Sequence, residues 1–185
     1  MSIDDLALTD GVVRLQDWDP GDAEWYAATA GQDELIQRFT AESPSVTPEE
    51  VRAAITNLAG QPKAVGFLIC DAVTGQRCGN ISLRHEAGIG HVSYWLAATA
   101  RGRGLASRAL QMVSRLAFDQ LGLDQLRLWT HVDNVASQYV AERAGFRRDP
   151  ERDQQKQVKG TAWDTIAYTL SSPARDQKAA HTRAS

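Results

Sequence analysis

Cysteine and long apolar runs are scarce in this 185-residue chain, which contains only Cys70 and Cys78 and no apolar run of 18 residues. Two cysteines form neither a disulfide framework nor a zinc ligand set. Without a long apolar run no membrane-spanning helix is expected. The first residues lack the basic and apolar regions of a secretory signal. We therefore expect a cytoplasmic protein without a metal site or a membrane partner.

The chain also lacks an excess of positive charge, because 20 lysine and arginine residues stand against 23 acidic residues. Proteins that bind nucleic acid are usually basic, so no nucleic-acid partner is expected. The charge is unevenly distributed: residues 1–60 contain 3 basic and 12 acidic residues, and residues 100–170 contain 11 basic and 8 acidic residues. This asymmetry suggests an anionic ligand bound by the second half and a cationic ligand bound by the first.

The length predicts a single domain, and the order of its predicted elements places it in the mixed α/β class. The domain is expected at residues 11–170, after an N-terminal extension at 1–10 and before a polar, disordered tail at 171–185. Its apolar patterns predict, in order, a strand, two helices, a meander of three strands, a helix, a strand, a helix and two strands. This order favours a mostly antiparallel sheet with helices on its faces.

Several predicted ends and turns carry specific residues. Thr47 and Glu50 have the spacing of a helix capping box. Asn134 is placed to cap a short helix that ends at Gly145. Gly75 marks a hairpin between strand-like runs at residues 64–70 and 78–83.

The most informative segment is residues 92–106, in which a strand, the loop Arg101-Gly102-Arg103-Gly104 and a helix follow one another. Glycine lets a ligand approach the backbone closely. The N–H groups at the start of a helix attract anions, and Arg108 adds a third positive charge beside the arginines of the loop. The segment therefore predicts a site for a diphosphate group.

Two common phosphate-binding motifs fit this loop less well. A dinucleotide fingerprint needs a glycine where the chain has Ser107, and an acid after the next strand, which ends in Thr130 and His131. A Walker phosphate loop needs lysine followed by serine or threonine, which this segment lacks. A glycine-rich loop that only begins a helix, without a ligand, stays an alternative.

Two motifs together resemble a known family. The pattern Arg-x-x-Gly-x-Ala at residues 101–106 is similar to the acyl-CoA-binding motif of the GNAT N-acetyltransferase superfamily, and Asp133-Asn134-x-x-Ser137, with residues 141–146, resembles its next motif. Tyr94-Trp95-Leu96, Gly160 and Asp164 resemble its ribosomal-protein N-terminal acetyltransferase (RimJ/RimL-like) group. The resemblance covers roughly residues 11–170. It implies the GNAT fold, a mixed sheet of about six to seven strands with about four helices.

The resemblance implies that acetyl-CoA binds as the acyl donor, without a metal, where strands ending at Leu96 and His131 diverge. Pantetheine would lie between these strands and contact the backbone of Trp95, Leu96 and Ala97, and Asn134 would also reach it. The diphosphate would bind the backbone of the loop and the first helical turn, formed by Arg101, Gly102, Arg103, Gly104, Leu105 and Ala106.

Acyl transfer also needs an acid that protonates the leaving thiolate. Many relatives use a tyrosine seven residues after the asparagine, but this chain has Ala141 there. Ser137 matches the serine of the RimJ/RimL-like group and is the expected acid, in the first turn of a helix where the dipole favours a developing anion. Tyr139 is a weaker candidate because its spacing places it on the apolar face of the helix, where we expect core packing.

The base that removes a proton from the amine is less clearly indicated. His91 lies where many relatives carry a strand glutamate, and an imidazole accepts a proton near neutral pH. Glu86 and His131 are the alternatives. Some relatives have a glutamate ten residues after the motif phenylalanine, whereas this chain has Lys156, so their ribosomal substrate does not transfer directly.

Two functions follow from these residues. The first is an acetyl-CoA-dependent N-acetyltransferase, in which a primary amine attacks directly in a ternary complex; the acceptor is a protein or peptide N-terminal α-amine or a small cationic amine. The second is a non-catalytic acyl-CoA-binding or regulatory module on the same fold. Trp25 and Tyr26 are candidates to line the acceptor pocket. The sequence is compatible with a monomer or a homodimer.

Overall fold

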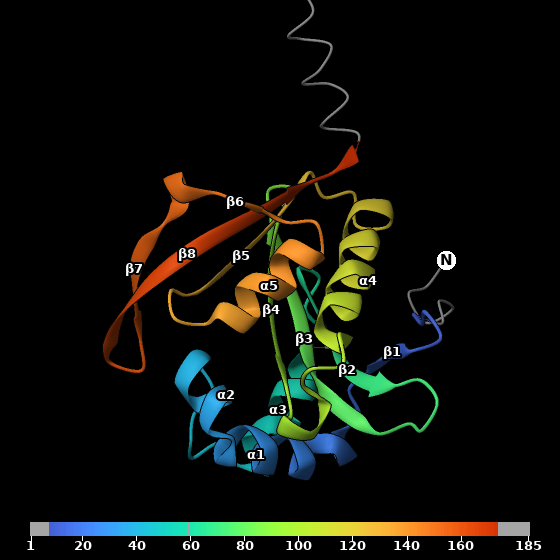
Figure 1. Cartoon of the computed structure of the whole chain (residues 1–185). Coiled ribbons are helices and arrows are strands. Elements are labelled where there is room, and N and C mark those ends of the chain that lie inside the picture. The colour runs from blue at the N-terminus through green and yellow to red at the C-terminus, as the bar shows by residue number, and fades with distance from the viewer. Residues whose placement is uncertain (1–7, 59, 174–185) are drawn as a thin grey trace, which may run out of the picture.

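The computed structural model of the chain describes residues 8–58 and 60–173 and contains one eight-stranded sheet between two layers of helices (Figure 1). The strand order is β1-β2-β3-β4-β5-β8-β6, with β7 paired to β8, and all pairs are antiparallel except β4 with β5. The strands are β1 Val13–Asp17, β2 Ala64–Asp71, β3 Arg77–Glu86, β4 Ile89–Leu96, β5 Gln125–His131, β6 Arg147–Arg148, β7 Gln154–Val158 and β8 Thr161–Ser171. This is the mixed, mostly antiparallel architecture that the sequence predicts.

Five α-helices among the described residues cover the sheet. One layer contains α4, Leu105–Asp119, and α5, Val135–Arg143, and the other contains α1, Ala23–Gln32, α2, Glu34–Phe39, and α3, Pro48–Leu58 (Figure 1). Most of the core lies under α4, whose Leu110 and Val113 are fully buried. Burial of a leucine side chain contributes roughly 1.5–3 kcal/mol. The apolar spacing of residues 105–117 therefore anchors α4, and with it the loop before it.

The predicted helix caps are present. The Glu50 N–H donates to Thr47 Oγ1 and the Thr47 N–H to Glu50 Oε2, which completes the capping box of α3. Asn134 Oδ1 accepts the Ser137 N–H at the start of α5. At its end Gly145 takes a left-handed φ of +92°, and the N–H of the residue after it bonds Ala141 O, as in a Schellman end.

Some local features differ from the sequence expectation. Helix α2 is absent from the predicted elements; Asp33 caps it by accepting the N–H groups of Leu35 and Ile36. Tyr139, which the spacing places in the core, is 59% exposed. On α5 only Ala141 is fully buried, so this short helix packs through small residues and leaves its tyrosine in solvent.

The ends of the chain lie partly outside the described residues, which exclude 1–7 and 174–185 of the expected extension and tail. Within the described part, the expected extension is not separate from the domain, because Leu8 packs against the main core and Thr9 forms a bridge with Arg14. Likewise β8 continues to Ser171, beyond the expected boundary at residue 170. In residues 8–58 and 60–173, no helix combines the length and apolar character needed to cross a membrane.

Candidate active site

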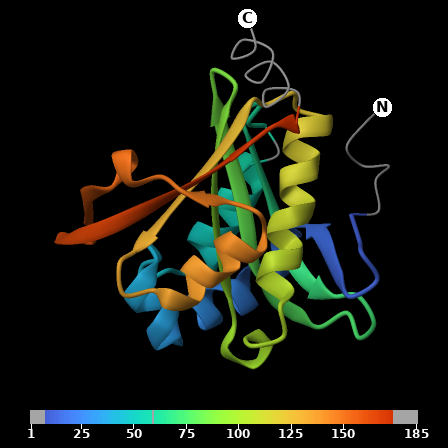
Figure 2. The ribbon, with the colours of Figure 1, turned by 45° about the horizontal axis from the view of Figure 1, so that its top comes forward.

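The central feature of the sheet is the divergence of its two parallel strands. β4 and β5 pair only at Ile89–Gln125, Gly90–Leu126 and His91–Arg127. Beyond these pairs β5 turns away from β4 toward the start of α5, as Figure 2 shows. We call this region, between residues 92–96 of β4 and 128–131 of β5, the split. The structure thus has the strand divergence that the sequence resemblance implies.

The backbone of β4 at the split faces two directions. Ala97 donates its N–H to Cys78 O on the β3 side, at 2.8 Å, and accepts the Ala100 N–H at its carbonyl. Backbone groups alternate in direction along an antiparallel pair. The N–H and C=O groups of Trp95 therefore also point toward β3, and those of Leu96 point toward the split. Of the three predicted pantetheine contacts, Leu96 therefore fits, whereas the backbone of Trp95 faces β3 and that of Ala97 is used by Cys78 and by the turn to Ala100. The Leu96 carbonyl accepts Arg101 Nη2 at 2.9 Å, which leaves its N–H directed into the split.

The loop before α4 has the geometry of an anion site. Gly102 and Gly104 take left-handed φ values of +75° and +74°, and a Cβ at either glycine would have no atom within 4 Å. No side chain caps α4, and its first turn closes only when the Arg108 N–H bonds Gly104 O. The N–H groups ahead of that bond point out of the helix start. The Arg101 N–H belongs to the preceding turn, because it bonds Ala98 O.

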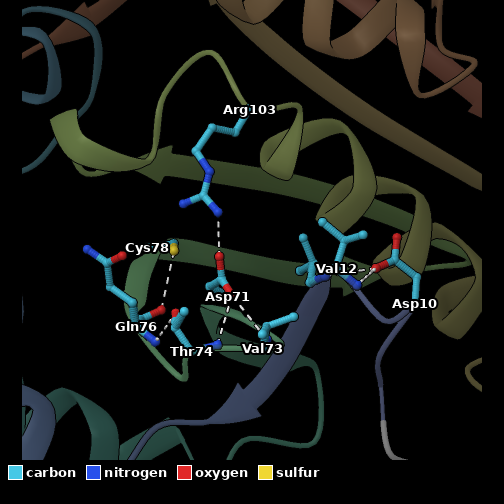
Figure 3. Close-up of polar contacts among 9 residues, drawn as sticks. Asp10, Val12, Asp71, Val73, Thr74, Gln76, Cys78 and Arg103 are labelled. Carbon is cyan, nitrogen blue, oxygen red and sulfur yellow. Dashed lines mark hydrogen bonds and ion pairs between the residues drawn. The ribbon is translucent and has the colours of Figure 1, made fainter.

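The three arginines around this loop are each paired with a carboxylate from an earlier part of the chain. Arg101 Nη2 lies 2.7 Å from Asp33 Oδ1, and Arg108 Nη1 lies 2.8 Å from Asp10 Oδ2. Arg103 reaches from the loop to Asp71 at the β2–β3 turn (Figure 3). The net positive charge expected at this loop is therefore largely balanced within the protein. Backbone N–H groups and the helix dipole remain as the main attraction for an anion.

Asp71 organises the turn that holds Arg103. Its carboxylate accepts the N–H groups of Val73 and Thr74, both at 3.0 Å (Figure 3). The Thr74 N–H, the Arg103 guanidinium and the Val73 N–H lower the pKa of Asp71 from 3.8 to about 2. The carboxylate is thus charged throughout the neutral range and fixes the loop to β2.

The start of α5 brings Ser137 to the strand on the other side of the split. Ser137 Oγ lies 2.9 Å from Tyr94 Oη, and Tyr94 also donates to Ser137 O at 3.3 Å. Burial raises the pKa of Tyr94 to about 12, against the hydrogen bond from Ser137, so its hydroxyl stays protonated. Asn134 uses Oδ1 for the cap. No acceptor within the described residues takes a hydrogen from its Nδ2, so this group is available to a ligand as well.

The three candidate bases lie in different places. His91 is in the paired part of β4, four residues before Trp95 and on the same face of the strand, about 13 Å along it. Partial burial and the charges of Arg127 and Lys156 lower its pKa below 6.5. Glu86 ends β3, is exposed and pairs with Lys63, so the structure does not bring it to the split.

His131 is the candidate at the split itself. Its ring contacts Phe39 of α2 and Trp163 of β8, with centroids 5.8 and 5.3 Å away. Its Nδ1 accepts the Asp133 N–H at 3.0 Å. A neutral ring in this state carries its hydrogen on Nε2, so His131 presents a donor rather than a base.

The opposite face of the sheet carries a carboxylate that no sequence motif indicates. Tyr94 and Leu96 pack with α4, whereas the Trp95 side chain packs against Ala30 and Ile36 under α1 and α2. There the Trp95 Nε1–H donates to Glu42 Oε1. Glu42 lies in an irregular loop without a motif, so only the fold reveals its place beside the split.

No group of three or more histidine, cysteine, aspartate or glutamate side chains within residues 8–58 and 60–173 is arranged to hold a metal ion. Cys70 and Cys78 are buried free thiols whose pKa values burial raises. The site consists instead of backbone N–H groups, one serine–tyrosine pair and, on the other face, a carboxylate among aromatic rings.

Comparison with solved structures shows the same fold. Spermidine N-acetyltransferase from Vibrio cholerae, solved in complex with CoA and spermine, has a TM-score of 0.76 at 16% identity, over 88% of this chain and 96% of that chain. A Salmonella typhimurium acetyl transferase that modifies the N-terminal serine of ribosomal protein L7/L12 has a TM-score of 0.73 at 19% identity, over 89% and 96% of the two chains.

Sequence comparison gives the family. A Bacillus subtilis protein named "Putative ribosomal N-acetyltransferase YdaF" is 29% identical over 99 residues, which span 52% of this chain and about half, 54%, of that protein. The family model described as "Acetyltransferase (GNAT) domain" matches residues 13–147, from β1 to β6. That match includes the split, the loop before α4 and the start of α5, and it confirms the resemblance seen in the sequence. The chain belongs to the GNAT acetyltransferase family.

Proposed function

We propose that the protein is an acetyl-CoA-dependent N-acetyltransferase that moves an acetyl group to a primary amine by direct attack in a ternary complex. The single observation that carries the proposal is the split, which has an uncapped helix start at one end and the Ser137 hydroxyl at its side. An elongated thioester with a charged diphosphate end fits this arrangement, because its two ends need different surroundings.

The backbone supports the two anionic parts of the reaction. The N–H groups after Gly102 receive the diphosphate, as open space at both glycines allows. The Leu96 N–H, directed into the split, is the donor proposed for the oxyanion that forms when the amine attacks the thioester carbonyl. Both sites are fixed by the sheet and by α4, so they need no rearrangement during the reaction.

Ser137 is the proposed acid. As the C–S bond breaks, the Ser137 hydroxyl gives its proton to the thiolate, the protonated Tyr94 hydroxyl at 2.9 Å stabilises the serine oxygen by a hydrogen bond, and water then returns a proton to the serine. The first turn of α5 adds a favourable dipole. The serine thereby takes the place of the tyrosine that is absent at Ala141.

His91 is the proposed base, acting through water. Its lowered pKa keeps the imidazole neutral, as a base must be, and it shares the Trp95 face of β4. The intervening distance along the strand requires that water carries the proton. His131, whose Nδ1 accepts the Asp133 N–H, is better placed to donate from Nε2 to the acceptor or to a water.

The acceptor class is proposed from the relatives. One structural relative is named for spermidine and another modifies a protein N-terminal serine, so small amines and N-terminal α-amines are both represented. A cytoplasmic location stays a prediction, as do the absence of nucleic acid from the reaction and the choice between monomer and homodimer.

Two measurements separate the enzyme from a non-catalytic acyl-CoA-binding module. Acetyl-CoA should raise the melting temperature of the protein, and a thiol-release assay with a panel of primary amines should then show turnover. Stabilisation without turnover on any amine supports the module. No stabilisation by acetyl-CoA or CoA contradicts both functions.

A further inference from the structure

We infer that Glu42 is the receptor for the ammonium group of the acceptor and that the acceptor is a primary amine with one positive charge. The inference deepens the proposed function and rests on it. Its basis is a carboxylate held by an indole N–H and a phenol O–H, on the face of β4 opposite to α4.

The first argument is position. Trp95 precedes Leu96, the proposed oxyanion donor, and its side chain points to the α1–α2 face while Leu96 packs on the α4 face. A diphosphate at the α4 start places the thioester on the α4 side of the split. An amine that attacks from the opposite side then arrives at the face where Trp95 and Glu42 lie.

The second argument is how the carboxylate is held. Tyr26 Oη donates to Glu42 Oε1 at 2.6 Å and Trp95 Nε1 donates to the same oxygen at 3.3 Å. Within the described residues, no donor reaches Oε2. Two neutral donors fix the orientation of the carboxylate without neutralising its charge, which suits a cationic ligand.

The third argument is charge in the surroundings. Two acids from the same part of the chain are paired, Asp33 with Arg101 and Asp22 with Arg77. The charge of Lys159 interacts with that of Glu42, but its Nζ donates to the carbonyl oxygens of Gln37 and Glu42 and to Gln37 Oε1 and forms no ion pair with the Glu42 carboxylate. A carboxylate held by neutral donors, without an ion pair, matches an ammonium group.

The fourth argument is the aromatic setting. Tyr26 and Trp25 pack on Trp95, with ring centroids 5.1 and 5.8 Å away, and Trp18 packs on both of them. Aromatic faces attract cations and exclude water, which strengthens a nearby charge interaction. They also favour an apolar segment next to the ammonium over a second charge. A polyamine would bring additional ammonium groups against these apolar rings.

The test uses Glu42→Gln, which keeps an acceptor for Tyr26 and Trp95 and removes the charge. The matched control is Glu34→Gln, since Glu34 is an exposed acid on the neighbouring helix α2. The probes are isoamylamine, its neutral acetamide and spermidine, titrated calorimetrically into the CoA-saturated protein. Acetyl-CoA stabilisation is measured for each variant.

We expect isoamylamine to bind the wild type and Glu34→Gln equally, to bind Glu42→Gln at least about tenfold more weakly, and to bind more tightly than its acetamide. Spermidine should bind no more tightly than isoamylamine. The inference is overturned if Glu42→Gln binds isoamylamine as tightly as the wild type does, or if Glu34→Gln loses as much affinity as Glu42→Gln. It is also overturned if the wild type binds no amine or binds spermidine more tightly than isoamylamine. Loss of acetyl-CoA stabilisation in the wild type instead contradicts the proposed function, so the two failures are distinguishable.

Discussion

At the scale of single residues, the contact between Ser137 and Tyr94 decides whether a serine can act as the acid. A serine hydroxyl that gives up its proton becomes a strong base and needs a donor beside it. Tyr94, with a pKa raised to about 12, is such a donor, and burial keeps it at the split. In the proposed mechanism the two hydroxyl groups therefore act together.

Replacing Ser137 with alanine should lower kcat on the order of 100-fold, because the thiolate loses its proton donor. Acetyl-CoA affinity should hardly change, since the diphosphate site lies on α4. Tyr94→Phe should give a smaller fall in kcat, with the same affinity. Steady-state kinetics and calorimetry check both variants.

Ser93→Ala is the matched control. Ser93 lies on β4 beside Tyr94, and its hydroxyl forms a hydrogen bond with Ser82 on β3 and does not face the split. Its kcat should equal that of the wild type. An unchanged kcat in Ser137→Ala would remove the serine from the mechanism.

The role of His91 can be tested by pH. Partial burial, Arg127 and Lys156 lower its pKa below 6.5, so the imidazole gains its proton, and stops being a base, only as the pH falls below that value. The acidic limb of kcat/KM should therefore lie below pH 6.5 and should disappear in His91→Ala. A limb that persists in His91→Ala but is lost in His131→Ala assigns the base to His131 instead.

At the scale of elements, α4 and the loop before it form one unit. The helix is anchored by buried residues, and Gly102 and Gly104 turn the loop so that N–H groups point outward. Arg101 joins this unit to the end of β4 through Leu96 O and to the cap of α2 through Asp33. The donor and acceptor sides of the site are thus held together by one side chain.

Gly104→Trp should abolish acetyl-CoA binding, measured by calorimetry, because the indole fills the space where the diphosphate binds. Gly122→Trp is the matched control at the other end of the same helix. Both glycines have left-handed φ values and open space around them. Both variants therefore carry a similar strain of about 1–2 kcal/mol. Equal losses of affinity in the two variants would show that strain, rather than blockage of the loop, is responsible.

At the scale of the whole molecule, ion pairs join the first 71 residues to the second half of the chain. Asp10, Asp33 and Asp71 pair with Arg108, Arg101 and Arg103. Asp10 and Asp33, two of the 12 acidic residues in residues 1–60, are therefore used within the domain. The uneven charge seen in the sequence suggests two ligands of opposite charge. Among the features of the described residues, only the start of α4 and Glu42 support that interpretation.

These carboxylates make the stability of the protein sensitive to acid. Despite burial, hydrogen bonds from Val13 N–H and from Arg108 lower the pKa of Asp10, and those from Arg101 and the Ile36 N–H lower that of Asp33. Asp71 has a pKa of about 2. A lowered carboxyl pKa stabilises the folded state above the unfolded value, near 3.9, and this stabilisation is lost as the pH falls through the folded value.

The free energy of unfolding should therefore fall steeply between about pH 4 and pH 2, measured by urea denaturation. The difference between the wild type and Asp71→Asn should be largest above pH 4 and shrink toward pH 2, where the wild-type carboxyl is itself protonated. Asp17→Asn, at an exposed position of β1, is the reference for loss of one charge. A difference that grows as the pH falls would contradict the assignment.

Local signals in the sequence predict much of the fold. The capping box at Thr47, the cap at Asn134 and the apolar spacing of residues 105–117 depend on neighbours within a few residues, and the structure contains all three. α2 escapes prediction because it has only six residues and takes its cap from Asp33, which is also committed to Arg101. The prediction for Tyr139 is wrong because helical spacing does not show which face a short helix buries.

The sequence by itself determined the family and the residues of the loop before α4, because a helix start and its glycines are local chemistry. Only the tertiary structure decided which backbone groups face the split. The direction of the N–H groups alternates along the chain, so that of Leu96 points into the split and that of Ala97 points to β3. It also decided that Arg101 and Arg108 are paired and that Glu42 lies beside Trp95. These contacts join residues that are 53 to 98 positions apart, and no local pattern encodes such a meeting.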